Sequence, residues 1–260
     1  MAYLNKVEIK SLWGTKNIAW NNIHEDVNII VGINGSGKTT LLNLIWGAIT
    51  NDSKIKNKYN HSEATYQYTY SDIPLIAEFI TTFDVVYSHK KKSESPLTLD
   101  LLDAIYTTGQ SKNTFYDYRL KATNFPEQAD SINKRIQSFY KLIDKQFSTT
   151  NKKIEVDPHT NKLIFKQNGN TIQLEDLSSG EKQFLLIMFK VFLMEEKPYI
   201  LLMDEPEISM HIEWQFELIN TIRELNPNCQ IILATHSPGI FGNGWGDKVV
   251  YMEDIMSDAN

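Results

Sequence analysis

Cysteine is almost absent from the sequence. The 260 residues include one cysteine, Cys229, so an internal disulfide is excluded. Cys229 precedes an apolar run and lacks the spaced Cys and His partners that a metal site or a nucleophile needs, so we expect a small residue near a strand. No HExxH motif or Ser/His/Asp triad is recognisable either. These absences exclude a disulfide scaffold, a zinc protease and a triad hydrolase.

Long apolar runs are also missing. The longest one, residues 184–194, is about half the length of a membrane span and contains Lys190. The first ten residues lack the apolar segment of a secretory signal. We therefore expect a soluble, cytoplasmic protein that makes no membrane contact.

Positive charge is not in excess. Lys and Arg number 26 against 32 Asp and Glu, which gives a formal net charge of -6. This balance argues against a protein that coats nucleic acid through bulk charge, although a local basic patch remains compatible with it. The lysine runs at 90–92 and 152–153 are expected to be solvated.

Hydrophobic residues, in contrast, make up 42% of the chain, which is ample for a globular core. Their spacing predicts apolar strands that alternate with helices in two parts of the chain. Strands are expected at 27–31, 199–203, 230–234 and 248–252, and helices at about 38–49, 178–195 and 213–225. The alternation predicts an α/β fold with a mostly parallel core sheet flanked by helices.

The rest of the chain is less regular. Residues 51–62 are expected to form a polar loop, and two or three strands are expected between 65 and 87. Between 88 and 150 the sequence predicts a charged loop and two amphipathic helices, at 97–106 and 127–147. The aromatic residues there are Tyr106, Phe115, Tyr116, Tyr118, Phe125, Phe139, Tyr140 and Phe147. Such aromatics either dock a partner or hold the helices together, and both interpretations stay open.

The most specific motif is the segment 32–39, GINGSGKT, between an apolar strand and a helix. It fits G-x-x-x-x-G-K-[ST], in which glycines allow a tight turn whose N–H groups face phosphate oxygens. Lys38 supplies a charge for the β- and γ-phosphates, and the Thr39 hydroxyl suits Mg²⁺. We predict an ATP and Mg²⁺ site whose nucleotide-binding residues are Gly32, Asn34, Gly35, Ser36, Gly37, Lys38, Thr39 and Thr40.

Polar side chains end two further apolar strands. Asp204 and Glu205 follow residues 200–203, so Asp204 is expected to join Thr39 as a Mg²⁺ ligand. Glu205 can accept a proton from the attacking water. His236 follows the strand at 230–234, and ligand sites of open α/β sheets lie at such strand ends. His236 is therefore expected to contact the γ-phosphate and to act in catalysis with Glu205.

The segment 177–183, LSSGEKQ, begins a helix. Ser178 suits the N-cap position, and Glu181 three residues later completes a capping box. The same segment also suits a second anion site, at which Ser178 and the backbone around Gly180 meet a γ-phosphate. The two interpretations are a well-capped helix and a phosphate contact.

The order and spacing of these four motifs resemble those of the ABC-type ATPases, over most of the chain outside residues 88–150. The resemblance implies one ATPase domain with an ATP-binding core, an antiparallel β lobe and a helical lobe. Its expected parts are an N-terminal β lobe with the phosphate loop at 1–87, a helical insertion at 88–150, and a half with the signature, the acids and His236 at 151–260.

The resemblance also implies a homodimer. Two subunits would clamp two ATP molecules head to tail, so that the signature of one chain completes the site of the other. The residues that would act across the dimer are Ser178, Ser179, Gly180 and Glu181. Ser179 stands where the family usually has glycine, a substitution that is compatible with its soluble members.

The segment after the acids, PEISMH at 206–211, is similar to that of soluble ATPases of the OLD and SMC-related group, which are common in bacterial anti-phage and DNA-maintenance systems. By this resemblance the residues 209–211 touch the opposite protomer. The residues after His236 are too few for the nuclease domain of OLD proteins, so we expect the ATPase to regulate a separate effector protein encoded nearby. The alternatives are a DNA-repair or DNA-maintenance ATPase and a transporter subunit.

Two features of the family have no clear residue in this chain. Gln67, in a Tyr-rich strand pattern, is a poor candidate for the lid glutamine, and the next glutamine is Gln110. Trp13 and Trp20 are both candidates for the aromatic side chain that stacks on adenine.

Overall fold

The computed structural model describes residues 3–59, 63–68, 74–81, 94–106 and 113–259. The chain divides into two compact units. The first contains Met1–Thr82, Glu196–Ile208 and Gln215–Asn260, and the second contains Phe83–Glu195 and Ser209–Trp214. No helix within the described ranges is long and apolar enough to cross a bilayer.

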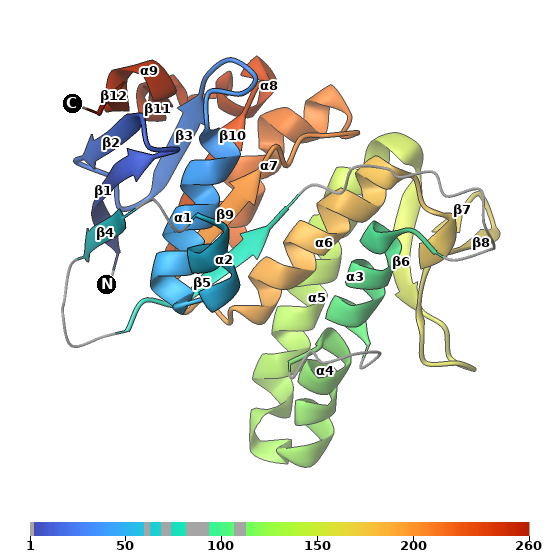
Figure 1. Cartoon of the computed structure of the whole chain (residues 1–260). Helices are drawn as coiled ribbons and strands as arrows, with labels where there is room; N and C mark the ends of the chain where they lie inside the picture. The colour runs from blue at the N-terminus through green and yellow to red at the C-terminus, as the bar shows by residue number, and fades with distance from the viewer. Residues whose placement is uncertain (1–2, 60–62, 69–73, 82–93, 107–112, 260) are drawn as a thin grey trace. The chain divides into compact units, whose positions relative to one another are not determined.

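The core of the first unit is a five-stranded parallel sheet in the order β11-β3-β10-β9-β5 (Figure 1). Its strands are β3 (Val27–Val31), β5 (Ala77–Ile80), β9 (Tyr199–Asp204), β10 (Cys229–Thr235) and β11 (Val249–Tyr251). All residues of β10 are buried, because a central parallel strand is covered on both faces. The register pairs Thr235 with Val31 and Ala234 with Asp204, so the carboxyl ends of β3, β10 and β9 lie side by side.

Helix α1 (Lys38–Thr50) follows β3 and buries its apolar side chains Leu41, Leu42, Leu44 and Ile45. Its spacing of apolar residues at three and four positions explains the single buried face. The other helices with residues in this unit are α2 (Ser53–Lys58), α7 (Ile212–Leu225), α8 (Pro238–Phe241) and α9 (Met252–Ile255), with a 3₁₀ turn at Gly246–Lys248.

A second sheet of the first unit is antiparallel, in the order β12-β2-β1-β4. Its strands are β1 (Leu4–Leu12), β2 (Lys16–Asn21), β4 (Glu63–Tyr68) and β12 (Met256–Asp258). Opposite Val7 of β1 lies Trp20 of β2, which is 2% exposed and belongs to the hydrophobic core. This sheet matches the antiparallel β lobe that the resemblance to the ABC-type ATPases implies.

The second unit is mainly helical. It contains α3 (Pro96–Ile105), α4 (Phe115–Asn124), α5 (Ala129–Gln146) and α6 (Ser179–Leu193), with 3₁₀ turns at Pro126–Gln128, Phe147–Thr150 and Leu174–Asp176. A small antiparallel sheet pairs β6 (Lys152–Val156), β7 (Leu163–Gln167) and β8 (Asn170–Gln173).

Aromatic side chains form much of the core of the second unit. The ring of Phe115 lies 5.0 Å from Phe189 and 5.4 Å from Phe192, and Phe139 lies 4.6 Å from Phe192. The guanidinium of Arg135 covers the Phe192 ring at 4.1 Å. Four of the eight aromatics noted in the sequence, Phe115, Tyr118, Phe139 and Phe147, are buried. For these four, the interpretation as packing residues is confirmed.

The predicted α/β fold with a parallel core sheet is confirmed, but α2, α4 and the four-residue helices α8 and α9 were not predicted among the described residues. Residues 53–58 form α2 where a polar loop was expected, because the Asp52 side chain caps the helix by accepting from the Lys54 N–H at 2.8 Å. Helix α4 was not expected either. A capping box between Thr114 and Asp117 begins it, and only Phe115 and Tyr118 are buried, so the apolar periodicity is weak.

Candidate nucleotide-binding site

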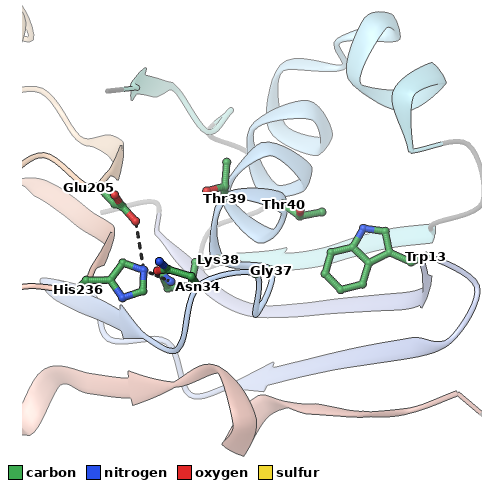
Figure 2. Close-up of a pocket in the computed structure, with 9 residues that line it drawn as sticks. Trp13, Asn34, Gly37, Lys38, Thr39, Thr40, Glu205 and His236 are labelled. Atoms are coloured by element: carbon green, nitrogen blue, oxygen red, sulfur yellow. Dashed lines mark hydrogen bonds and ion pairs between the residues drawn. The ribbon is translucent and has the colours of Figure 1, made fainter. Parts of the chain in front are cut away.

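A cavity of about 640 Å³ lies at the carboxyl edge of the parallel sheet, within the first unit (Figure 2). It is lined by Trp13, Asn34, Gly35, Gly37, Lys38, Thr39, Thr40, Glu205 and His236. Trp13 directly follows β1, and the other residues follow the carboxyl ends of β3, β9 and β10 or belong to the first turn of α1. Open α/β sheets bind ligands at such strand ends. The structure thus brings together most of the residues that the sequence singled out.

The phosphate loop needs its glycines for two separate reasons. Gly35 and Gly37 have φ angles of 77° and 99°, in the left-handed region where a side chain is strained. A Cβ on Gly37 would also lie 2.9 Å from the Trp13 ring. Gly37 ends the loop as the N-cap of α1, whose first N–H groups have no acceptor within the helix. The loop therefore leads directly to a helix end that favours an anion.

Lys38 is nearly buried, at 5% exposed, and its ammonium is held by three groups. Nζ donates to the carbonyl oxygens of Gly32 at 2.9 Å and Ile33 at 3.3 Å, and it lies 2.7 Å from Nε2 of His236. Burial lowers the pKa of Lys38, and the nearby carboxylates of Glu205 and Asp204 oppose this shift. The ammonium is thus held in a partly desolvated position at the rim of the cavity.

His236 lies between Lys38 and Glu205 in Figure 2. Its Nε2 is 3.2 Å from Oε1 of Glu205 as well as 2.7 Å from Nζ of Lys38. One ring nitrogen cannot accept a hydrogen bond from Lys38 and donate one to Glu205 at the same time. The two contacts are therefore alternatives. If a phosphate oxygen takes the hydrogen bond of Lys38, Nε2 of His236 becomes available to donate to Glu205.

Asp204 and Thr39 provide oxygen atoms that suit Mg²⁺. Burial raises the pKa of Asp204, and a hydrogen bond with the Thr39 side chain opposes the shift. Oδ1 of Asp204 is buried, and no described residue forms a hydrogen bond with it. In the described part of the chain no three His, Cys, Asp or Glu side chains cluster as a metal site. Mg²⁺ typically binds one or two carboxylates together with substrate phosphates, and the Asp204 carboxylate fits that pattern.

The backbone of Glu205 is unusual. Its φ of 46° lies in the left-handed region, which is uncommon for a residue other than glycine. The Glu205 N–H donates to the Ala234 carbonyl at 2.8 Å, so the turn after β9 is tied to the end of β10. Residues in such conformations occur preferentially at functional sites.

Glu207 had no expected role, and only the fold reveals its contacts. It is 8% exposed, and its Oε1 accepts hydrogen bonds from the Thr235 hydroxyl and from the His236 N–H at 3.2 Å. Burial raises its pKa. A second acid two residues after Glu205 is the only sequence signal that could have drawn attention to it.

The signature segment belongs to the second unit, where the capping box is confirmed. The Ser178 N–H donates to Glu181 Oε2 at 2.9 Å, and the Glu181 N–H donates to Ser178 Oγ at 3.3 Å. Glu181 is 4% exposed and pairs with Lys152 at 2.5 Å. The contact of this segment with a phosphate stays a prediction.

Gly180 packs against the segment after the acids. A Cβ there would lie 2.1 Å from the Ser209 carbonyl oxygen, so only glycine fits without a shift of the backbone. Ser209 itself has a φ of 65°. The signature and residues 209–210 are therefore in direct contact within the second unit.

The two tryptophan candidates differ sharply. Trp20 is a core residue, whereas Trp13 is 50% exposed, lines the cavity and lies beside the phosphate loop, away from Glu205 and His236 (Figure 2). Gln67 lies on β4 opposite Lys6 and is not among the residues that line the cavity. Gln110 lies outside the described residues.

Comparison with known proteins places these features in a family. The sequence profile of a family described as "AAA ATPase domain" matches residues 86–241, which include the signature, Glu205 and His236.

Two curated proteins are similar in sequence. The Septu protein PtuA of Bacillus thuringiensis is 24% identical over 92% of this chain and 72% of its own length. The Retron Vc95 probable ATPase of Vibrio cholerae is 30% identical over an aligned region that covers 49% of this chain and 26% of that protein.

Among solved structures, the Smc head bound to the C-terminal winged-helix domain of ScpA is similar in fold. The TM-score is 0.57 at 13% identity, over 93% of this chain and 92% of that one. This likeness shows the fold of an SMC head, an ABC-type ATPase fold.

Proposed function

This chain belongs to the AAA ATPase domain family, and from that premise we propose that it hydrolyses ATP to ADP and phosphate in the cavity around Lys38. The observation that carries the proposal is the meeting of Lys38, Glu205 and His236 at the ends of three parallel strands. Each comes from a different motif, and the His236 ring lies within hydrogen-bonding distance of both Lys38 and Glu205.

Each side chain has a distinct part in the proposed reaction. Lys38 and the N–H groups of the phosphate loop bind the β- and γ-phosphates. Thr39 and Asp204 hold Mg²⁺, whose chemistry there is to neutralise charge on the phosphate oxygens. Glu205 takes a proton from the water whose oxygen bonds to the γ-phosphorus as the bond to the bridging oxygen breaks. His236 donates to Glu205 once Lys38 has turned to the phosphate.

The proposed working unit is a head-to-tail pair of chains, each forming one ATPase domain over residues 1–260. Supporting this, Ile33 of the phosphate loop is 81% exposed and Ile208, close after Glu205, is 39% exposed. Large apolar side chains beside a catalytic cavity are unfavourable in water, and a second copy would cover them. Residues Ser178, Ser179 and Gly180 of that copy would then contact the γ-phosphate.

Phosphate release from ATP by the purified chain, in a buffer with Mg²⁺, tests the function. We expect the rate per subunit to rise with protein concentration, because both sites form only in the pair. Chelation of Mg²⁺ should abolish release. Wild-type protein that releases no phosphate at any concentration would contradict the proposal.

Trp13 is the proposed contact for the adenine base. Trp13→Ala should weaken ATP binding by about 5- to 150-fold, since stacking of a base on an aromatic ring contributes about 1–3 kcal/mol. Binding of inorganic tripolyphosphate, which has no base, should stay unchanged, and Trp13→Phe should keep most of the affinity. Titration calorimetry with both ligands measures the difference. Equal losses for ATP and tripolyphosphate would place Trp13 against the phosphates instead.

The proposed biological role is control of a separate effector protein in a bacterial defence system. Similarity to the Septu protein PtuA and to a retron ATPase supports this setting. Co-purification with the product of a neighbouring gene, with and without ATP, tests it. The exposed Lys134 is suited to a charge-reversal variant, whereas Arg135 is not, because it donates to the Phe192 carbonyl in the core.

A further inference from the structure

We propose that Glu207 is a positioning residue that holds His236 between Lys38 and Glu205. The proposal rests on the ATPase function proposed for this cavity. Glu207 itself does not line the cavity. It acts through the backbone and side-chain hydroxyl groups at the end of β10.

Glu207 is buried beside the end of β10. A carboxylate that is 8% exposed is costly unless hydrogen bonds compensate it. Within the described part of the chain its Oε1 accepts two hydrogen bonds from one short segment, from the Thr235 hydroxyl and the His236 N–H. Hydrogen bonds to a charged acceptor are about twice as strong as neutral ones. Glu207 thus fixes the peptide group that carries the His236 ring.

The segment that carries His236 is also held from its other side. The Ser237 N–H donates to Thr235 Oγ1 at 2.9 Å, and Ser237 Oγ donates to Oε1 of Gln215 on α7 at 2.6 Å. The Thr235 hydroxyl therefore donates to Glu207 while it accepts from Ser237. This chain of bonds leaves the backbone at 235–237 little freedom to move.

Glu207 also belongs to the turn that carries Glu205. The Ile208 N–H donates to the Glu205 carbonyl at 3.2 Å, and the Glu205 N–H donates to the Ala234 carbonyl. Together with the bonds of Glu207, these tie the turn after β9 to the end of β10 at several points. The separation of 3.2 Å between His236 and Glu205 follows from that connection (Figure 2).

One atom argues against a merely structural role. Oε2 of Glu207 is buried and has no hydrogen-bond partner among the described residues. Leaving such a group unpaired costs stability, and native proteins keep few of them. An apolar side chain would fill the same space at lower cost if only packing were needed. The hydrogen bonds that Oε1 accepts from Thr235 and His236 explain why a carboxylate occupies this position.

The experiment is a double-mutant cycle on ATP hydrolysis. Glu207→Ala should lower kcat by about 100-fold, the scale of a misplaced catalytic group, with the KM for ATP changed less than about threefold. In a His236→Ala background Glu207→Ala should have no further effect on kcat, because its action passes through His236. Equal losses of kcat in both backgrounds would overturn the proposal.

Milder variants keep the test decisive if Glu207→Ala fails to fold. Thr235→Val removes the hydroxyl donor at nearly constant shape and should lower kcat about tenfold, whereas Thr235→Ser should retain the wild-type rate. Asp26→Asn is the matched control. It removes another structural carboxylate of the same unit, which bonds Lys248 at 3.0 Å, and it should leave kcat unchanged.

A readout without hydrolysis separates this proposal from the proposed function. In NMR spectra of protein with labelled histidine, the His236 ring signal, identified by its loss in His236→Ala, should shift or broaden in Glu207→Ala and Thr235→Val. It should stay in place in Asp26→Asn. An unchanged His236 signal in Glu207→Ala refutes the positioning role, whereas a wild-type protein without ATPase activity refutes only the function.

Discussion

Lys38→Ala is expected to weaken ATP binding by about 10²- to 10⁴-fold and to abolish measurable hydrolysis. The ammonium is partly desolvated, so water competes only weakly for its hydrogen bonds to phosphate oxygens. Each charge-assisted bond contributes about 1.5–3 kcal/mol, and the β- and γ-phosphates provide two. The loss also removes the group that holds Nε2 of His236 at 2.7 Å. Calorimetry with ATP and a phosphate-release assay measure the two effects.

The control for this variant is Lys54→Ala, which removes an exposed lysine of α2 in the same unit. It should leave both binding and hydrolysis unchanged, which excludes an effect of net charge alone. If Lys38→Ala binds ATP as tightly as the wild type, the loop at 32–39 is not the phosphate site.

Glu205→Gln should separate hydrolysis from binding. The amide keeps the shape of the side chain but cannot accept the proton of the attacking water. Loss of a general base typically lowers kcat by about 10²–10⁴-fold. Phosphate contacts through Lys38 and the loop remain, so ATP affinity should change by less than about threefold.

The same variant also tests the pairing of subunits. Because ATP is bound but not consumed, the closed pair should persist, and sizing with ATP and Mg²⁺ should give a dimer. Without nucleotide the variant should elute as a smaller species. Glu25→Gln, an exposed acid of the same unit, is the control and should hydrolyse ATP at the wild-type rate. A monomer under every condition would count against the head-to-tail arrangement.

Several parts of the fold and site were predictable because the interactions that define them join residues only a few positions apart in the sequence. The phosphate loop is a strand, a glycine turn and a helix in direct succession, and the φ angles of Gly35 and Gly37 follow from that turn. The capping box of Ser178 and Glu181 spans three residues. The buried strands β9 and β10 were predicted from continuous apolar runs, since parallel strands are covered on both faces.

Weak local sequence signals explain why helices α2 and α4 were not predicted. Helix α2 has six residues, too few for a periodic pattern, and its Asp52 cap decides its start. Helix α4 carries charged and polar residues around two buried aromatics, and its partners lie elsewhere in the second unit. A capping box ending in Asp117 was present in the sequence, but no apolar periodicity followed it.

The sequence by itself determined the chemistry of the motifs and the class of the fold, since these depend on residue type and on short-range spacing. Only the tertiary structure decided which side chains meet. Strand register buries Trp20 opposite Val7, while Trp13 is left exposed beside the phosphate loop. The pairing of β10 between β3 and β9 brings His236 to Lys38, 198 positions away in the chain, and to Glu205. No local pattern records such contacts, because they depend on which strands pair and in which register.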